Sequence, residues 1–210
     1  MIYLRKSVEP KLLAENKQAW TDELLQGNDA ALAARKYALP SIKAALVQET
    51  NGKCAYCESK MLHVTYGDVE HIVPKKVDKA LAFEWSNLTL ACDVCNTKKG
   101  AHVDILDPYG VDPADNFWFC GPLMFTLHGA DPEAEITMLK LELNRSALLE
   151  RRNERVRNLE RQLKIINKTP DANVRDALLI ALIDSETQDE TEFAACNRGF
   201  VGYLQSTGKI

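Results

Sequence analysis

The sequence of 210 residues predicts an α+β protein that is mostly helical, with a small cysteine-containing module between two helical regions. Apolar residues recur at helical spacing in the first 50 residues and again from residue 146 onward. Between them, two C-x-x-C pairs lie in a segment with little helical period before residue 90. We therefore expect three parts packed as one compact unit: an N-terminal helical region at 1–52, the metal module at 53–103, and a hairpin with C-terminal helices at 104–210.

The N-terminal region is expected to hold three helices. The first ends at Gly27, and Asn28 and Asp29 can cap a second, alanine-rich helix. Ser41 is the expected cap of the third helix. The pair Asn51-Gly52 ends this helix, because glycine adopts the left-handed conformation that commonly closes a helix.

Short strands are expected in the middle of the chain. Residues 69–73 alternate in character up to Pro74, as a short strand does. Residues 116–128 predict a hairpin that turns at Gly121-Pro122. Residues 135–141 fit either another strand or the start of a helix.

A long helix is expected from Ser146, because apolar residues there follow one face. Two further helices are expected at residues 172–184 and 190–205. The apolar seam of the long helix consists of Leu149, Val156, Leu159, Leu163 and Ile166.

Hydropathy and charge narrow the class of protein. No apolar run approaches the roughly 20 residues of a membrane span, and the opening residues lack the order of a signal peptide, so we expect a cytoplasmic protein without a membrane partner. The net charge is −4. Residues 104–142 hold eight acidic residues against one base, residues 171–192 hold seven against one, and residues 145–168 hold eight bases against three acidic residues. Such a protein is not expected to bind nucleic acid strongly on its own.

The six cysteines indicate a metal site rather than disulfides, because cytosolic thiols are kept reduced. Cys54 and Cys57 form one C-x-x-C pair, and Cys92 and Cys95 form a second. Two such pairs can supply the four sulfur ligands of a structural Zn²⁺, and a complete sulfur shell leaves no open position for catalysis. A redox or metal-free pairing is the alternative.

Residues suited to hydrolysis lie between and beside the cysteine pairs. They are Asp68-Val69-Glu70-His71-Ile72-Val73-Pro74-Lys75-Lys76, then Asn87-Leu88, then Cys92-x-x-Cys95-Asn96-x-x-Lys99-Gly100. In this order the residues resemble the HNH endonucleases. A wider likeness over most of the chain resembles the PtuB-like HNH nuclease subunits of Septu and retron-associated anti-phage systems. It rests on Ile2-x-x-Arg5-Lys6-x-x-x-Pro10, Lys53-Cys54-Ala55-Tyr56-Cys57-Glu58, and Leu141-x-Leu143-Asn144-Arg145 followed by Arg151.

The HNH resemblance implies a two-stranded hairpin and a helix, the ββα-metal motif, around one Mg²⁺ or Mn²⁺. By that resemblance Glu70 and Asn96 coordinate the cation, and Asn87 braces the loop and aligns His71. In commoner HNH patterns, Asp precedes the first histidine, where this sequence has Glu70. A second histidine there occupies the position that Asn96 holds in this sequence. His71 is the expected general base, since an imidazole titrates near neutral pH and can take a proton from water. Because alternation points Glu70 and His71 to opposite sides of a strand, a kink or the strand end is expected to bring both to one centre.

Structural alternatives exist for these residues. Glu70 is otherwise a solvated strand carboxylate, since Asp68 can face the same side, and Asn96 is otherwise a helix cap. The bases at 145–168 either follow a nucleic-acid backbone or form a solvated surface. Phosphate contacts, with solubility as the alternative, are expected of Lys75, Lys76, Lys98 and Lys99. The remaining cysteines, Cys120 and Cys196, are expected in the core, and the remaining histidines, His63, His102 and His128, are expected to be structural or on the surface.

The sequence thus predicts a metal-dependent endonuclease that hydrolyses phosphodiester bonds, with DNA favoured over RNA. The resemblance implies an ABC-type ATPase partner that gates the nuclease and, in a retron-associated system, a reverse transcriptase with its RNA–DNA product. The alternative is a non-catalytic zinc-ribbon adaptor that binds nucleic acid or the partner. An adaptor needs only the four cysteines, whereas this sequence also holds Glu70, His71, Asn87 and Asn96.

Overall fold

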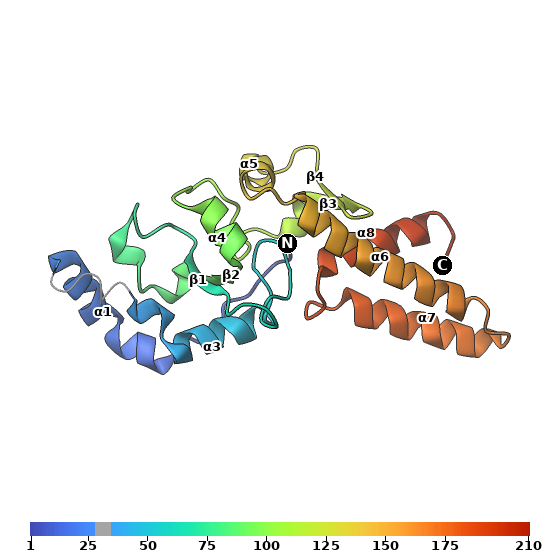
Figure 1. Cartoon of the computed structure of the whole chain (residues 1–210), viewed down its shortest axis with the longest axis horizontal. Coiled ribbons are helices and arrows are strands. Elements are labelled where there is room, and N and C mark those ends of the chain that lie inside the picture. The colour runs from blue at the N-terminus through green and yellow to red at the C-terminus, as the bar shows by residue number, and fades with distance from the viewer. Residues whose placement is uncertain (28–34) are drawn as a thin grey trace. The chain divides into compact units, whose positions relative to one another are not determined.

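The computed structural model describes residues 1–27 and 35–210, which group into two compact units (Figure 1). One unit comprises residues 3–112, and the other comprises residues 1–2 and 113–210. The mostly helical α+β class is confirmed, and the described residues form two small antiparallel sheets among the helices. The three-part division expected from the sequence stays a prediction. None of the described helices is long and apolar enough to cross a membrane.

Two helices open the unit of residues 3–112. Helix α1 (Lys11–Gln26) ends at Gly27 with φ of 78°, as expected. The predicted caps Asn28 and Asp29 lie outside the described residues, and a 3₁₀ turn, η1 (Lys36–Ala38), follows that gap.

Helix α3 (Pro40–Glu49) begins one residue before the predicted cap. Leu39 occupies the cap position, so the assignment of Ser41 was wrong. A proline at the first helical position explains the difference, because its fixed φ suits a helix start and its missing N–H is not needed there. Beyond the end of the helix, Gly52 has a positive φ, as expected, and Asn51 has one as well.

The middle of this unit has the order strand, strand, helix. Strands β1 (Asp68–His71) and β2 (Leu88–Ala91) pair antiparallel, with His71 opposite Leu88, and helix α4 (Asp93–Lys99) follows. Two 3₁₀ turns lie between the strands, η2 (Lys79–Leu81) and η3 (Trp85–Asn87). The ββα order that the resemblance implied is therefore present.

A partly buried polar cluster ties the N-terminal arm to this module. Lys6 Nζ pairs with Glu49 Oε1 at 3.0 Å and donates to the carbonyl of Leu88. The same ammonium lies 4.5 Å from the ring centre of Trp85 and 4.3 Å from that of Tyr109. Tyr109 Oη also donates to Glu49 Oε1 at 2.6 Å. Burial lowers the pKa of Lys6, and Glu49 offsets part of that shift.

The other unit begins with a hairpin and a short helix. Strands β3 (Phe117–Cys120) and β4 (Leu123–Thr126) pair antiparallel around Gly121, whose φ is 56°, as the sequence predicted. Residues 135–141, for which the sequence allowed either a strand or the start of a helix, are helical up to Lys140 and belong to α5 (Pro132–Lys140).

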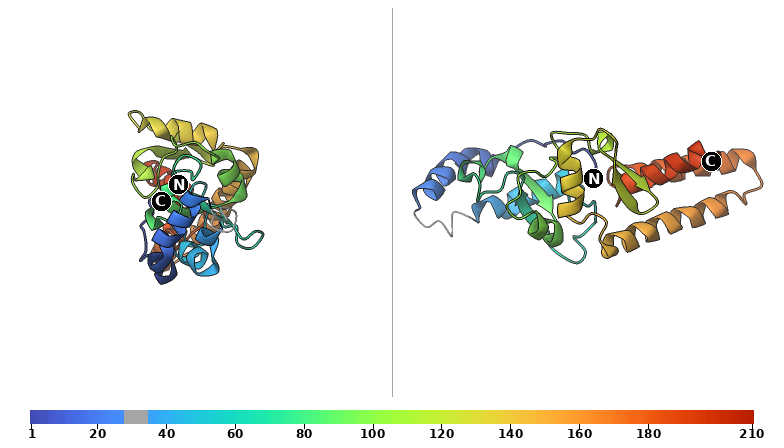
Figure 2. Two further views of the ribbon diagram at one scale, coloured as in Figure 1. Left: turned by 90° about the vertical axis from the view of Figure 1, so that its left-hand side faces the viewer. Right: turned by 90° about the horizontal axis from the view of Figure 1, so that it is seen from above.

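Three helices complete that unit: α6 (Ser146–Ile166), α7 (Ala172–Thr187) and α8 (Ala194–Ser206). They pack against one another and run alongside each other (Figure 1 and Figure 2). Helix α8 also packs on β3. A Cβ at Gly199 would lie 2.9 Å from Phe119 Cβ, so the close approach of the helix to the strand depends on this glycine.

Three expectations about side chains in this unit were wrong. The buried seam of α6 begins at Leu148 instead of Leu149, and it includes Arg152. The Arg152 guanidinium donates to the carbonyl of Leu143 at 2.8 Å, and this residue is 1% exposed, so it cannot contact nucleic acid. Cys120 is exposed because it points to the solvent side of the hairpin, whereas Cys196 is buried as expected.

The basic stretch at residues 145–168 contacts the acidic stretch at residues 171–192 within this unit. Arg155 pairs with Glu186 at 2.5 Å, and Arg151 lies 3.7 Å from Glu192. These pairs neutralise part of the basic charge of α6. Less positive charge on this helix is therefore available to contact a nucleic-acid backbone.

Replacing Glu49 by alanine is expected to lower the free energy of unfolding by about 3 kcal/mol, because removing one partner of a buried ion pair leaves the other charge uncompensated. The side chain of Glu49 is fully buried, and that of Lys6 is 21% exposed. The double variant Lys6→Met/Glu49→Leu is expected to regain much of the loss. Denaturant unfolding followed by circular dichroism measures both effects.

The matched control is Glu15→Ala, since the Lys11–Glu15 pair is solvent-exposed. Exposed pairs contribute at most about 1 kcal/mol. If Glu49→Ala and Glu15→Ala cost the same small amount, the polar cluster does not stabilise the N-terminal arm.

Candidate active site

The four cysteines of the two C-x-x-C pairs converge on one point. Their sulfur atoms lie within 4.8 Å of one another, and all four residues are buried. Cys57 Sγ and Cys92 Sγ are 3.9 Å apart. A tetrahedral Zn²⁺ with bonds of about 2.3 Å holds its sulfurs about 3.8 Å apart, so the cluster fits a structural zinc.

Local backbone geometry positions these sulfurs. Cys92 is the cap residue of α4, and its sulfur accepts from the backbone N–H of Cys95 at 3.4 Å. The first pair is tied to β2, because Ala55 N donates to the carbonyl of Leu90 at 2.9 Å. Burial raises the pKa of the Cys54 thiol, so a cation bound at the cluster would favour the deprotonated form of this sulfur.

His71 lies at the end of β1 and is 5% exposed. Its Nε2 is 3.0 Å from the carbonyl oxygen of Ala82. Because a carbonyl only accepts, Nε2 carries the proton and Nδ1 is the basic nitrogen of the neutral ring. Burial lowers the pKa of His71 to about 4, so the imidazole is neutral at pH 7.

The amide of Asn87 makes three hydrogen bonds to the loop that follows β1. Asn87 Oδ1 accepts from Val73 N at 2.7 Å, and Nδ2 donates to the carbonyls of Val73 and Leu81, both at 3.0 Å. The second carbonyl is one residue before Ala82, which contacts His71. The amide thus links the start and the end of the loop that faces the histidine.

Lys99 and Glu70 form a buried ion pair. Lys99 Nζ lies 2.9 Å from Glu70 Oε1 and donates to the carbonyl of His71 at 2.8 Å. Lys99 is 0% exposed, so it has no surface from which to contact phosphate, contrary to the expectation. Glu70 is also buried, which excludes the solvated strand carboxylate. Burial raises the pKa of the Glu70 carboxyl, and the Lys99 ammonium partly offsets that rise.

Asn96 projects from α4 toward β1. Its Nδ2 donates to Asp68 Oδ2 at 2.9 Å, which orients the amide. The cap of α4 is Cys92, so the alternative role of Asn96 as a cap was wrong. Asp68 and Glu70 are two residues apart on β1 and share one face. This face therefore gathers carboxylate and amide oxygens, a donor set that suits Mg²⁺ or Mn²⁺.

The side chains of Glu70 and His71 have different neighbours, as strand alternation requires. Glu70 contacts Lys99, whereas the His71 ring contacts Ala82 and Tyr37. The backbone carbonyl of His71 accepts from Lys99. The kink that would bring both side chains to one centre stays a prediction.

The other predicted phosphate contacts differ in environment. Lys76 is exposed and Lys98 is half-buried. Lys75 is half-buried, and its Nζ donates to Tyr37 Oη at 2.7 Å. Tyr37 was not among the predicted site residues, because it belongs to no motif and lies more than 30 positions before His71.

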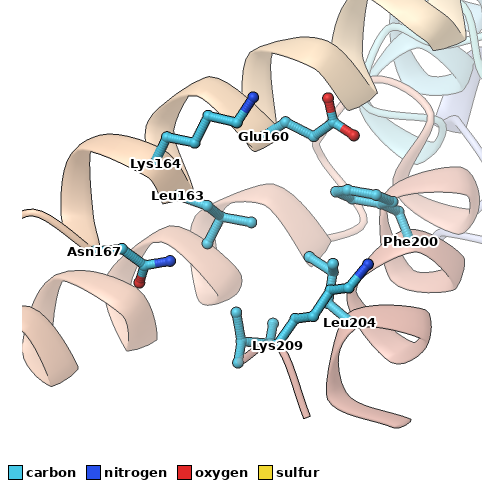
Figure 3. A pocket seen from close by; sticks show the side chains of 8 residues that line it. Glu160, Leu163, Lys164, Asn167, Phe200, Leu204 and Lys209 are labelled. Atoms are coloured by element: carbon cyan, nitrogen blue, oxygen red, sulfur yellow. The ribbon is translucent and has the colours of Figure 1, made fainter. Parts of the chain in front are cut away.

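A pocket of about 360 Å³ lies in the C-terminal unit, between α6 and the end of the chain (Figure 3). Its apolar side includes Leu163, Phe200 and Leu204, with Glu160 and Lys164 beside them. No residue of the predicted site lines this pocket.

Comparisons with known proteins agree with this geometry. The family model of the HNH endonuclease matches residues 54–102. The Septu protein PtuB of Bacillus thuringiensis is 32% identical over 152 residues, which cover 69% of this chain and 55% of that protein. The Septu protein PtuB of Bacillus mycoides (strain KBAB4) is 26% identical over 191 residues, covering 75% of this chain and 64% of that protein. The chain thus spans less than two thirds of these curated relatives, and the resemblance found in the sequence is confirmed.

The purified chain is expected to contain one zinc ion, and Cys54→Ser is expected to lose it together with much of the thermal stability, because metal binding and folding are coupled in such modules. Elemental analysis and thermal unfolding measure the two effects. The control is Cys120→Ser, which changes an exposed cysteine outside the cluster and should retain the zinc. Well-folded wild-type protein without zinc would contradict the assignment.

Proposed function

We propose that this chain, whose residues 54–102 belong to the HNH endonuclease family, is a metal-dependent endonuclease that hydrolyses phosphodiester bonds of DNA. One observation carries the proposal. His71 is held by the carbonyl of Ala82 with Nδ1 as its basic nitrogen, and the ring is neutral at pH 7. The neutral ring has Nδ1 as its proton-accepting nitrogen, and the burial that lowers its pKa to about 4 makes it a weaker base than the near-neutral imidazole expected from the sequence.

His71 acts as the general base in this proposal. Nδ1 takes a proton from the attacking water, and the hydrogen bond from Nε2 to Ala82 keeps the ring in place while the imidazolium forms. Asn87 holds the loop that carries the Ala82 carbonyl, so it is a positioning residue for His71. A non-catalytic adaptor would not need the buried hydrogen bonds that position His71 and Asn87.

Glu70 and Asn96 are the proposed ligands of a Mg²⁺ or Mn²⁺ ion, and Asp68 orients the amide of Asn96. When bound, such an ion would supply electrostatic stabilisation for the negative charge that grows on the scissile phosphate and on the leaving 3′ oxygen. Lys99 holds the Glu70 carboxylate against β1 and compensates its charge.

The cysteine cluster is proposed to bind a structural zinc that fixes α4. Cys92 and Cys95 lie at the start of α4, and Asn96 and Lys99 lie on the same helix. A metal bound to both cysteine pairs sets the position of that helix relative to β1, where Glu70 and His71 lie. The zinc thereby supports the site without taking part in the reaction.

The biological setting is proposed from the relatives, which are named Septu proteins. We infer that the chain is the effector subunit of an anti-phage defence complex with an ABC-type ATPase, either alone with it or with a retron reverse transcriptase and its RNA–DNA product. Lys75, Lys76 and Lys98 are the proposed phosphate contacts of the nuclease.

His71→Ala is expected to reduce cleavage by at least about 10²-fold, because the general base contributes to the transition state. Plasmid nicking with Mn²⁺, with and without the ATPase partner, measures the loss. Zinc content and melting temperature should stay near those of the wild type. The control is His63→Ala, which removes an exposed histidine. Near-wild-type cleavage by His71→Ala would show that another group is the base, and an inactive wild type in every arm would favour the adaptor.

Binding of DNA by the chain alone is expected to be micromolar or weaker at about 150 mM salt and strongly salt-dependent, because few bases flank the site and the net charge is −4. Addition of the ATPase partner should raise both affinity and cleavage rate. Fluorescence anisotropy with a labelled duplex measures the affinity. Nanomolar binding and rapid cleavage by the chain alone would show that no partner is needed.

A further inference from the structure

We infer that Tyr37 and Lys75 form a phosphate-binding subsite beside His71, which takes a backbone phosphate of the substrate strand next to the one that is cleaved. The inference rests on the proposed nuclease function and adds to it a residue outside the matched region 54–102. Tyr37 belongs to η1, before helix α3, whereas Lys75 follows β1.

Three side chains lie in a row at this point. The Tyr37 ring meets the His71 ring edge-on, with ring centres 4.5 Å apart and an interplanar angle of 78°. Lys75 Nζ lies 4.3 Å from the centre of the Tyr37 ring and donates to Tyr37 Oη at 2.7 Å. The ammonium, the phenol and the imidazole are therefore consecutive neighbours, so a strand bound at His71 would come within reach of Lys75.

The donors of this pair suit an anion. A phenol that accepts a hydrogen bond from an ammonium still has its own O–H to donate. An ammonium has three N–H donors, and the structure assigns one of them to Tyr37. Among the described residues, no carboxylate pairs with Lys75, so its charge is not neutralised there. Lys99, the other cation beside His71, is committed to Glu70.

Tyr37 also connects the proposed general base, His71, with the proposed phosphate contact, Lys75. The same ring of Tyr37 that holds Lys75 packs on the His71 ring, so one side chain links binding to the orientation of the base. Removing the hydroxyl alone should affect binding, whereas removing the ring should affect binding and turnover. A tyrosine that only fills space would give neither difference.

The variants Tyr37→Phe, Tyr37→Leu and Lys75→Gln test the subsite in the cleavage assay with the partner complex. Tyr37→Phe keeps both ring contacts and should raise KM about 5-fold with kcat nearly unchanged, the effect of one hydrogen bond to a charged group. Lys75→Gln should raise KM about 10-fold and lower the salt slope of binding by about 1. Tyr37→Leu should lower kcat as well. Matched controls are Tyr66→Phe, 88% exposed, and Lys79→Gln, also exposed.

A binding arm separates failure of the subsite from failure of the proposed function. Affinity for a labelled DNA duplex is measured at low salt without divalent metal ions, so that no cleavage occurs and the His71 ring stays in contact with Tyr37. Weaker binding by Tyr37→Phe and Lys75→Gln, with both controls unchanged, supports the subsite even if the wild type does not cut. Wild-type affinity in both variants overturns the subsite, whether or not the wild-type protein cleaves DNA.

Discussion

The candidate site depends on the buried ammonium of Lys99. This group is completely removed from solvent, so its charge and its donors need protein partners, which are the carboxylate of Glu70 and the carbonyl of His71. Both partners lie on β1, and Lys99 lies on the last turn of α4. The helix is therefore attached to the strand at its end by this ion pair, and its start carries Cys92 and Cys95 of the sulfur cluster. Asn96 lies between these two points and donates to Asp68 of β1.

Two residues of the wider motif, which lie outside the ββα segment, make structural contacts within their own units. Lys6 belongs to the opening motif, and its contacts join the arm to helix α3 and to β2. In the other unit, Asn144 closes a structural link, because its amide accepts from Met124 N at 2.9 Å and donates to the carbonyl of Met124 at 2.7 Å. These motif residues stabilise their own units and take no part in the proposed chemistry.

The sequence was sufficient where a local pattern determines the outcome. The C-x-x-C spacing predicted the sulfur cluster, and the order of the HNH residues predicted two strands and a helix. It was insufficient where burial depends on distant partners. Lys98-Lys99 is the pattern of a surface segment, yet the second lysine is buried against β1. The strand Phe117–Cys120 is apolar throughout, so its sequence could not show that Cys120 faces outward. Tyr37 belongs to no motif, and only its packing on His71 identifies it.

The hydrogen bond from His71 to Ala82 has a consequence for how such a site can change during evolution. The carbonyl belongs to the turn after η2, so the loop between the strands determines which imidazole nitrogen stays basic, although the histidine itself is on β1. An insertion that moved this carbonyl away would allow the other tautomer and would place the basic nitrogen on the opposite side of the ring. Changes in the length of this loop during evolution are therefore limited by the need to keep Nδ1 as the basic nitrogen of His71. The side chain at position 82 contributes nothing to the hydrogen bond, because His71 contacts the backbone carbonyl.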